Sequence, residues 1–167
     1  MKKNSFLNLF PHGLLKNQTI PFIQKGEWAI HELLPFLLSE TGKADVRIAT
    51  FNIAEESLRA IFFMLEKREI DSIKLLLDMN VRRHKLELLL FAANIMPDVR
   101  LTSNHSKILL VENSDWKIGV VGSANLNKNP RYESGFIFTN TEYYDYFQKE
   151  FDIIFENDAI KYTIEND

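Results

Sequence analysis

Two short polar stretches, each beside an apolar run, carry side chains that could act on a phosphate group. His105 and Lys107 precede the apolar run 108–111, and Ser123 and Asn125 follow another apolar run. Residues two positions apart on a strand point the same way, so each pair should project together. An ammonium and an amide can hold phosphate oxygens, while an imidazole can attack phosphorus or transfer a proton. If the two strands are neighbours, all four groups converge on one spot.

The spacing of these residues resembles the signature of the phospholipase D superfamily. That signature is His-x-Lys, four further residues and Asp, with Gly-Ser-x-Asn downstream. His105 and Lys107 fit the first motif, and residues 122–125 fit the second. The resemblance covers residues 28–157.

Two positions depart from the superfamily pattern. Glu112 stands where the superfamily usually has Asp, an acid that generally supports the site rather than reacting. Arg131 stands where the superfamily usually has Asn, two residues before an acid that is Glu133 here. The resemblance implies that Glu133 hydrogen-bonds the catalytic histidine and orients it.

The resemblance implies a metal-independent phosphodiesterase without a cofactor. Short members of the superfamily with one His-x-Lys motif, such as the bacterial endonuclease branch, form homodimers in which two motifs meet. His105 of one subunit would then attack phosphorus to form a phosphohistidine, and the partner subunit's His105 would protonate the leaving oxygen and later activate water. Lys107 and Asn125 would hold the charged oxygens, with help from Ser123. A nuclease acting on DNA or RNA is the leading interpretation.

Two other functions remain open at this point. A phospholipid-acting phosphodiesterase would share the motifs, although the sequence has no membrane segment or basic amphipathic helix to support it. A DNA-binding module could keep the fold without turnover, and the departures at Glu112 and Arg131 keep this alternative open.

A basic cluster offers a possible phosphate-binding patch. Arg82, Arg83 and Lys85 follow the predicted strand 73–77 and are expected to open a helix, where cations oppose the helix dipole. Ligand sites are common at the carboxyl ends of strands in α/β sheets, so substrate binding would explain the cluster. A solvated start of a helix would explain it almost as well.

Composition excludes several classes of site. The 167 residues include no cysteine, which rules out disulfides, a thiolate nucleophile, Cys-ligated zinc and iron–sulfur clusters. The formal net charge of -3 excludes a basic field over the whole molecule, so nucleic acid would need a local patch. No carboxylate cluster or His pair has the spacing of metal ligands. His12, His31 and His84 are expected at the surface or in packing.

The chain lacks an apolar stretch of about 18 residues and a signal-peptide core. We therefore expect a cytoplasmic protein without stable membrane association.

The predicted elements must bring these residues together. Apolar spacing predicts a helix from residue 30, containing Pro35 and ending at Thr41, a strand at 46–51 and a helix capped by Asn52. A strand at 73–77 and a helix at 86–93 follow. This α-β-α-β-α order predicts an α/β fold, an α-β-α sandwich with a mixed, largely parallel sheet of the phospholipase D type.

The second half predicts short strands and one last helix. The strands are expected at 99–101, 108–111, 117–121 and 135–138, and the helix begins at Thr141, which would cap it. Residues 1–26 are expected to form an arm or irregular lead-in. Residues 27–167 are expected to form a single catalytic domain.

Overall fold

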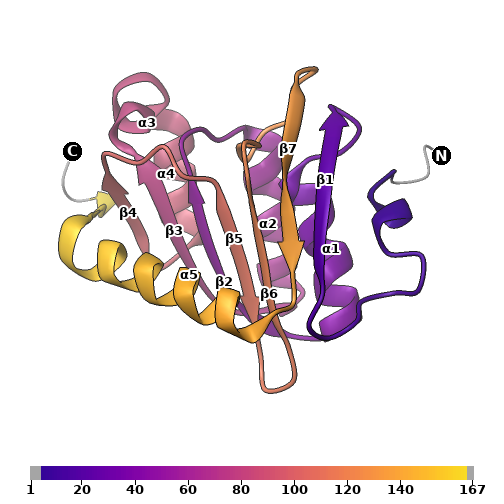
Figure 1. The fold of residues 1–167 in the computed structure, drawn as a ribbon. Coiled ribbons are helices and arrows are strands. Elements are labelled where there is room, and N and C mark those ends of the chain that lie inside the picture. The colour runs from indigo at the N-terminus through magenta and orange to yellow at the C-terminus, as the bar shows by residue number, and fades with distance from the viewer. Residues whose placement is uncertain (1–4, 165–167) are drawn as a thin grey trace.

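The computed structural model describes residues 5–164. One mixed sheet of eight strands forms the centre of the molecule, in the order β1-β7-β6-β5-β2-β3-β4-β8 (Figure 1). Helices α1, α2 and α4 cover one face, and α5 crosses the lower part of the other face. The prediction of an α/β sandwich with a mixed sheet is confirmed.

The strands are β1 (Thr19–Lys25), β2 (Ala44–Thr50), β3 (Ile70–Asp78), β4 (Val99–Thr102), β5 (Ile108–Glu112), β6 (Lys117–Gly122), β7 (Tyr132–Phe138) and β8 (Ile160–Lys161). The α-helices are α1 (Ile30–Thr41), α2 (Glu55–Glu66), α3 (Met79–His84), α4 (Leu86–Ile95) and α5 (Thr141–Ile153). A 3-10 helix, Ser5–Leu9, precedes them, and a π-helix, Ile154–Asp158, continues α5.

The sheet is mostly antiparallel, so the prediction of a largely parallel sheet is wrong. Only the neighbours β2, β3 and β4 run parallel, and every other adjacent pair of described strands is antiparallel. Parallel neighbours need a long crossover connection, which α2 and α4 supply in the first half of the chain. The connections among β5, β6 and β7 contain no helix, and these strands pair as antiparallel neighbours.

The N-terminal segment contains an integral strand. Strand β1 pairs antiparallel with β7 at the edge of the sheet, and Phe6, Phe10 and Phe22 are buried in the core. The expectation of an irregular lead-in is therefore wrong for residues 19–25. The strand buries only alternate residues over a short length, so its period is too weak to recognise. Residues 1–4 of the expected arm and 165–167 of the expected domain lie outside the described residues.

Two predicted helix caps are wrong by one or two positions. Helix α2 follows Ala54, and Asn52 Oδ1 accepts instead from the backbone N–H of Ile53 at 3.0 Å. Helix α5 is capped by Asn140, whose Oδ1 accepts from the Tyr143 N–H at 3.1 Å, and Thr141 is its first residue. Neighbouring polar residues can each cap a helix, and the backbone path decides which one does.

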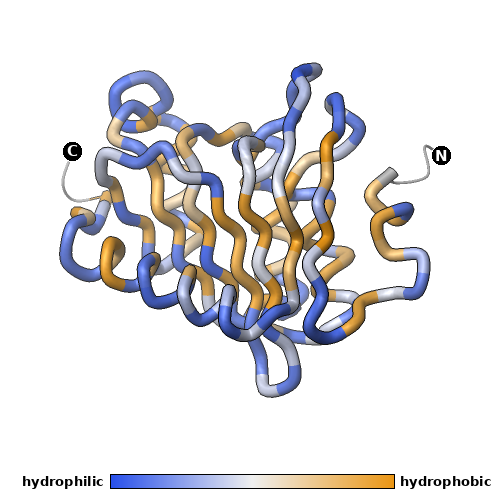
Figure 2. The backbone as a smooth tube through the Cα atoms, in the orientation of Figure 1, coloured by the Kyte–Doolittle hydropathy of each residue, from blue (hydrophilic) through white to orange (hydrophobic). Residues whose placement is uncertain are grey.

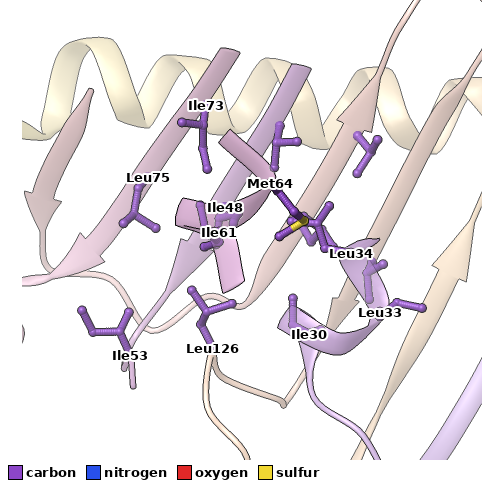
Figure 3. Close-up of a cluster of buried hydrophobic side chains, with 14 of the residues drawn as sticks. Ile30, Leu33, Leu34, Ile48, Ile53, Ile61, Met64, Ile73, Leu75 and Leu126 are labelled. Carbon is purple, nitrogen blue, oxygen red and sulfur yellow. The ribbon is translucent and has the colours of Figure 1, made fainter. Parts of the chain in front are cut away.

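The main core lies between the sheet and helices α1, α2 and α4. Leu34 of α1 and Ile61 of α2 lie in one buried cluster with Ile48 of β2 and Leu75 of β3 (Figure 3). The strands carry much of the hydrophobic sequence, and the loops at both ends of the sheet are largely hydrophilic (Figure 2). This packing fixes the carboxyl ends of β2 and β3 as a rigid edge.

The helix α5 is attached to the other face partly through charge. Asp152 accepts hydrogen bonds from Arg47 of β2 and Lys74 of β3, at 3.1 and 3.0 Å. Glu156 pairs with Lys74 at 3.1 Å and with Arg100 of β4 at 2.9 Å. Within residues 5–164, no helix combines the length and apolar character needed to cross a membrane.

Candidate active site

The loop between β4 and β5 carries the first motif across the carboxyl ends of β3 and β2. Because β5 lies beside β2, this loop has to pass over both parallel strands (Figure 1). Buried Asn104 anchors it: its N–H donates to Asp78 Oδ2 at 2.9 Å, and Nδ2 donates to the Thr50 carbonyl at 3.2 Å. Asp78 ends β3 and Thr50 ends β2, so His105 follows a fixed point.

His105 and Lys107 come together at this edge. Lys107 Nζ lies 3.1 Å from His105 Nδ1 and also donates to the His105 carbonyl oxygen. The Phe51 ring lies against the imidazole, with centroids 4.8 Å apart, and Lys107 Nζ is 5.6 Å from the centre of the same ring. The imidazole itself is exposed and therefore accessible to a substrate.

The contact with Lys107 has a definite donor and acceptor when the lysine is charged. A lysine ammonium only donates hydrogen bonds, so His105 Nδ1 is the acceptor in this contact. Partial burial lowers the pKa of Lys107, while the nearby carboxylates Glu133 and Asp78 oppose that shift.

The second motif reaches the same edge because β5 and β6 are antiparallel neighbours, with Ile108 paired to Val121. The Gly122 N–H donates to the Lys107 carbonyl at 3.3 Å, which joins the two motifs directly. Asn125 lies just beyond, where its Oδ1 accepts from Thr50 Oγ1 at 3.4 Å. The structure thus brings His105, Lys107 and Asn125 to one edge.

Glu133 lies with Ser123 rather than with the histidine. The Ser123 hydroxyl donates to Glu133 Oε2 and accepts from the Ser134 N–H at 3.0 Å. The structure shows no hydrogen bond between Glu133 and His105 among the described residues, in contrast to the sequence-based expectation. Glu133 therefore influences the motif through its charge near Lys107.

Asn129 belongs to the site although the sequence motifs did not indicate it. Its Nδ2 donates to Glu133 Oε1 at 3.1 Å, and its Oδ1 accepts from the Arg131 N–H at 2.9 Å. An asparagine is therefore present beside this acid, four positions before it instead of two. Arg131 itself is exposed. A search for Asn within a few residues of Glu133, rather than at one fixed spacing, would have found this partner.

The basic cluster lies where α3 ends and α4 begins, so the prediction that it opens a helix holds for Lys85, the N-cap residue of α4, and is wrong for Arg82 and Arg83. Arg82 and Arg83 are exposed in the last turn of α3, where cations interact favourably with the helix dipole. Lys85 follows α3 and its Nζ donates to the Ile53 carbonyl at 2.7 Å, which ties this turn to the loop after β2. The two arginines remain candidates for phosphate contact, while the head group of Lys85 serves the fold.

The acid of the first motif lies at the opposite end of β5. Glu112 is about 14 Å along the strand from Ile108. It accepts hydrogen bonds from Tyr144 at 3.3 Å and Gln148 at 3.1 Å, both in α5, and lies 3.6 Å from Arg47. Glu112 thus joins the sheet to α5 and does not enter the site.

The remaining histidines lie elsewhere. His31 is buried, with Nδ1 2.9 Å from Ser57 Oγ, and burial lowers its pKa. His12 and His84 are exposed. Among the described residues, no three His, Cys, Asp or Glu side chains gather in the way that a metal site requires.

No protein-family model and no curated protein matches the sequence. Solved structures do match in fold. Nuc from Salmonella typhimurium, a phospholipase D family member, aligns with a TM-score of 0.60 and 19% identity over 85% of this chain and 98% of that chain. NucT from Helicobacter pylori aligns with a TM-score of 0.65 and 16% identity over 87% of this chain and all (100%) of that chain.

A third neighbour is TrmBL2, an archaeal chromatin protein with a novel mode of DNA binding. It aligns with a TM-score of 0.58 and 17% identity, over 85% of this chain and 55% of that chain. These similarities establish the phospholipase D fold for the chain.

Proposed function

We propose that this phospholipase D-like chain is a phosphodiesterase, a nuclease that works as a homodimer through a phosphohistidine intermediate. The observation that carries the proposal is the meeting of His105, Lys107 and Asn125 at one edge of the sheet, from two joined motifs. An accessible imidazole beside a cation and an amide suits attack on a charged phosphodiester.

The proposed reaction has two balanced steps. In the first, a nitrogen of His105 bonds to phosphorus while the bond to the leaving oxygen breaks, and the partner subunit's His105 gives that oxygen a proton. In the second, water attacks phosphorus, the partner subunit's His105 takes a proton from it, and the phosphorus–nitrogen bond breaks. Lys107 and Asn125 stabilise the charge on the oxygens in both steps.

The contact between Lys107 and His105 Nδ1 gives the substrate a role in activation. Attack by Nε2 requires the ring hydrogen to be on Nδ1, and that nitrogen is occupied by Lys107 in the structure. A phosphate anion is a stronger partner for the ammonium than a neutral ring nitrogen. We therefore expect substrate binding to draw Lys107 away from Nδ1 and to free the imidazole for the reactive tautomer.

A sheet face that α5 leaves open supports the homodimer. Phe136 of β7 is 49% exposed and lines a groove with Tyr143 and Phe147 of α5. Ile23 of the neighbouring strand β1 is 74% exposed. Contiguous exposed apolar surface indicates an interaction site, and a second copy is the partner that a site with one histidine needs.

Nucleic acid is favoured as the substrate class by the exposed arginines Arg82 and Arg83, which lie at the end of the helix that follows β3. The chain has a net charge of -3, so its phosphate contacts must come from such a local patch. DNA binding by the neighbour TrmBL2 gives a second candidate function, a binding module without turnover. We place either activity in the cytoplasm.

The test is hydrolysis of bis(p-nitrophenyl) phosphate in excess EDTA. We expect the wild-type chain to release p-nitrophenol, and His105→Ala to abolish release while His12→Ala, an exposed histidine elsewhere, does not. Activity that disappears in EDTA and returns with a divalent ion would overturn the metal-independent mechanism. Full activity of His105→Ala would remove the proposed nucleophile, and absence of wild-type activity with intact DNA binding would favour the binding module.

A further inference from the structure

A depression of about 220 Å³ lies beside the edge of the sheet that carries His105, Lys107 and Asn125, which we call the reacting edge. It is formed where the loop after β2 faces α3. The residues that line it are Phe51, Asn52, Asn80, Val81, His84 and Lys85.

The depression is joined to the proposed catalytic histidine through one side chain. Phe51 lines it, and the same ring lies 4.8 Å from the imidazole of His105, centroid to centroid. The two walls are held to the site by Asn104, which bonds to Thr50 before Phe51 and to Asp78 before α3. A ligand in the depression would therefore lie at a fixed position relative to the reacting edge.

The lining combines an aromatic ring with amide groups. Asn52 Oδ1 accepts from the Ile53 N–H, which leaves its NH₂ group available as a donor. The side chain of Asn80 is exposed and makes no hydrogen bond within the described chain, so it offers both a donor and an acceptor. Lys85 donates to the Ile53 carbonyl and holds the wall in place.

We propose that this depression binds one base of a single-stranded nucleic acid, next to the phosphate that is cleaved. The inference rests on the proposed function and specifies its substrate. Phe51 supplies a face on which a base can stack, and Asn52 and Asn80 supply hydrogen bonds for its edge. A base inside a duplex is stacked and paired, so it has to leave the helix to enter.

The chemistry of the lining argues against a lipid chain in this position. Burial of an apolar chain against the two amides would remove them from water without a hydrogen bond, which is unfavourable. The volume is also smaller than the roughly 300–1,000 Å³ typical of pockets for larger ligands. A single flat ring with polar edges can form hydrogen bonds with the two amides and is small enough for this volume.

The experiment measures binding of a fluorescent oligothymidylate of eight nucleotides and of an abasic deoxyribose-phosphate oligomer of the same length. The background is His105→Ala, so that turnover does not interfere. We expect the oligothymidylate to bind about tenfold more tightly, because stacking of one base contributes on that order. Phe51→Ala and Asn80→Ala should each reduce the difference, and Asn80→Ala does so without altering a contact of the imidazole.

Matched controls are Phe63→Ala, an exposed phenylalanine of α2, and Asn94→Ala, an exposed asparagine of α4. Both should keep the preference for bases. Equal binding of the two oligomers, or equal effects of site and control variants, would overturn the inference. The proposed function fails separately, if the wild-type chain hydrolyses neither oligothymidylate nor bis(p-nitrophenyl) phosphate.

Discussion

Residues of the first motif lie at both ends of strand β5, and their surroundings differ. At one end, His105 is exposed, and the Lys107 ammonium contacts His105 and the ring of Phe51. At the other end, Glu112 is bonded to two side chains of α5 and lies near Arg47. The comparison shows that the motif has two separate roles: the basic pair can meet a substrate, and the acid holds the sheet to its helix.

The burial of Tyr144 explains why the acid is held so firmly. Burial raises the pKa of the Tyr144 hydroxyl, so the group remains protonated and donates to Glu112 at all ordinary pH values. An Asp at position 112 would be one methylene shorter. The longer Glu side chain allows contact with the helix from the same strand position.

Of the variants that compare the two ends of β5, His105→Ala is expected to have the largest effect, and this effect is on the rate of hydrolysis. Hydrolysis should fall about a thousandfold or more, because the residue is proposed to form the covalent intermediate. The free energy of unfolding should change by less than about 0.5 kcal/mol, since the side chain is exposed. Initial rates and urea unfolding on the same preparation measure both quantities. A large loss of stability would contradict the separation of roles.

The reverse outcome is expected from Glu112→Ala. The free energy of unfolding should fall by about 1–3 kcal/mol, because Tyr144 and Gln148 lose their acceptor and Arg47 loses a nearby charge. The rate per folded molecule should remain within about twofold of wild type at temperatures well below unfolding. Glu112→Gln keeps an acceptor oxygen and should lose less stability. A specific loss of kcat in either variant would place the acid in the reaction.

The pH profile of activity distinguishes the role of Glu133, which lies near Lys107, from that of Glu112 at the far end of β5. Burial lowers the pKa of Lys107, and Glu133 opposes this shift. Glu133→Gln should therefore lower the pKa of Lys107 further, so that the ammonium loses its proton at a lower pH. The alkaline limb of the kcat/KM profile should move to lower pH in Glu133→Gln and stay in place in Glu112→Gln. A shift in the opposite direction would contradict the electrostatic role of Glu133.

The smallest effect is expected from the arginines of α3. Arg82→Ala and Arg83→Ala should each weaken nucleic-acid binding severalfold and reduce the slope of log Kd against log salt by about 0.7–0.9 for each phosphate that the variant no longer neutralises. The weakening should be equal on all sequences, because phosphate contacts carry no base information. Lys85→Ala should act mainly on stability, because it removes the hydrogen bond to the Ile53 carbonyl. Unchanged binding in both arginine variants would leave α3 outside the interface.

Sequence alone predicted that the two motifs lie at one edge of the sheet, because each motif adjoins a strongly apolar strand. His105 with Lys107 and Ser123 with Asn125 lie in the loops beside β5 and β6, outside the strands, so strand alternation does not position them. Their approach follows from the hairpin that these two strands form. A motif with one fixed spacing missed the partner of Glu133, because that partner's position depends on the path of the loop that holds Asn129. Phe51 was equally hidden, since its contact with His105 joins segments that are distant in the sequence and meet only because β2 and β5 pair.

Local sequence patterns also could not predict which neighbouring strands run parallel and which run antiparallel. The alternation of helices and strands in the first half correctly indicates β2 and β3, and β4 is among the short strands expected in the second half. The position of β5 beside β2 is a tertiary choice. That choice makes the loop cross two strand ends and so creates the site. Strand β1 was missed for a related reason: its partner β7 lies in the last third of the chain.

The pairing of β1 with β7 has a consequence for synthesis of the chain. The contact between Gln18 and Thr139 at the end of this pair spans 121 positions, so β1 has no partner strand until most of the protein has left the ribosome. At typical elongation rates that interval is on the order of ten seconds. Folding dominated by such distant pairs is slow, and an unpaired strand is exposed to aggregation meanwhile. A circular permutant with joined termini and a new start between β1 and β7 shortens the stretch of chain between these two strands, and it should therefore refold faster than the natural order.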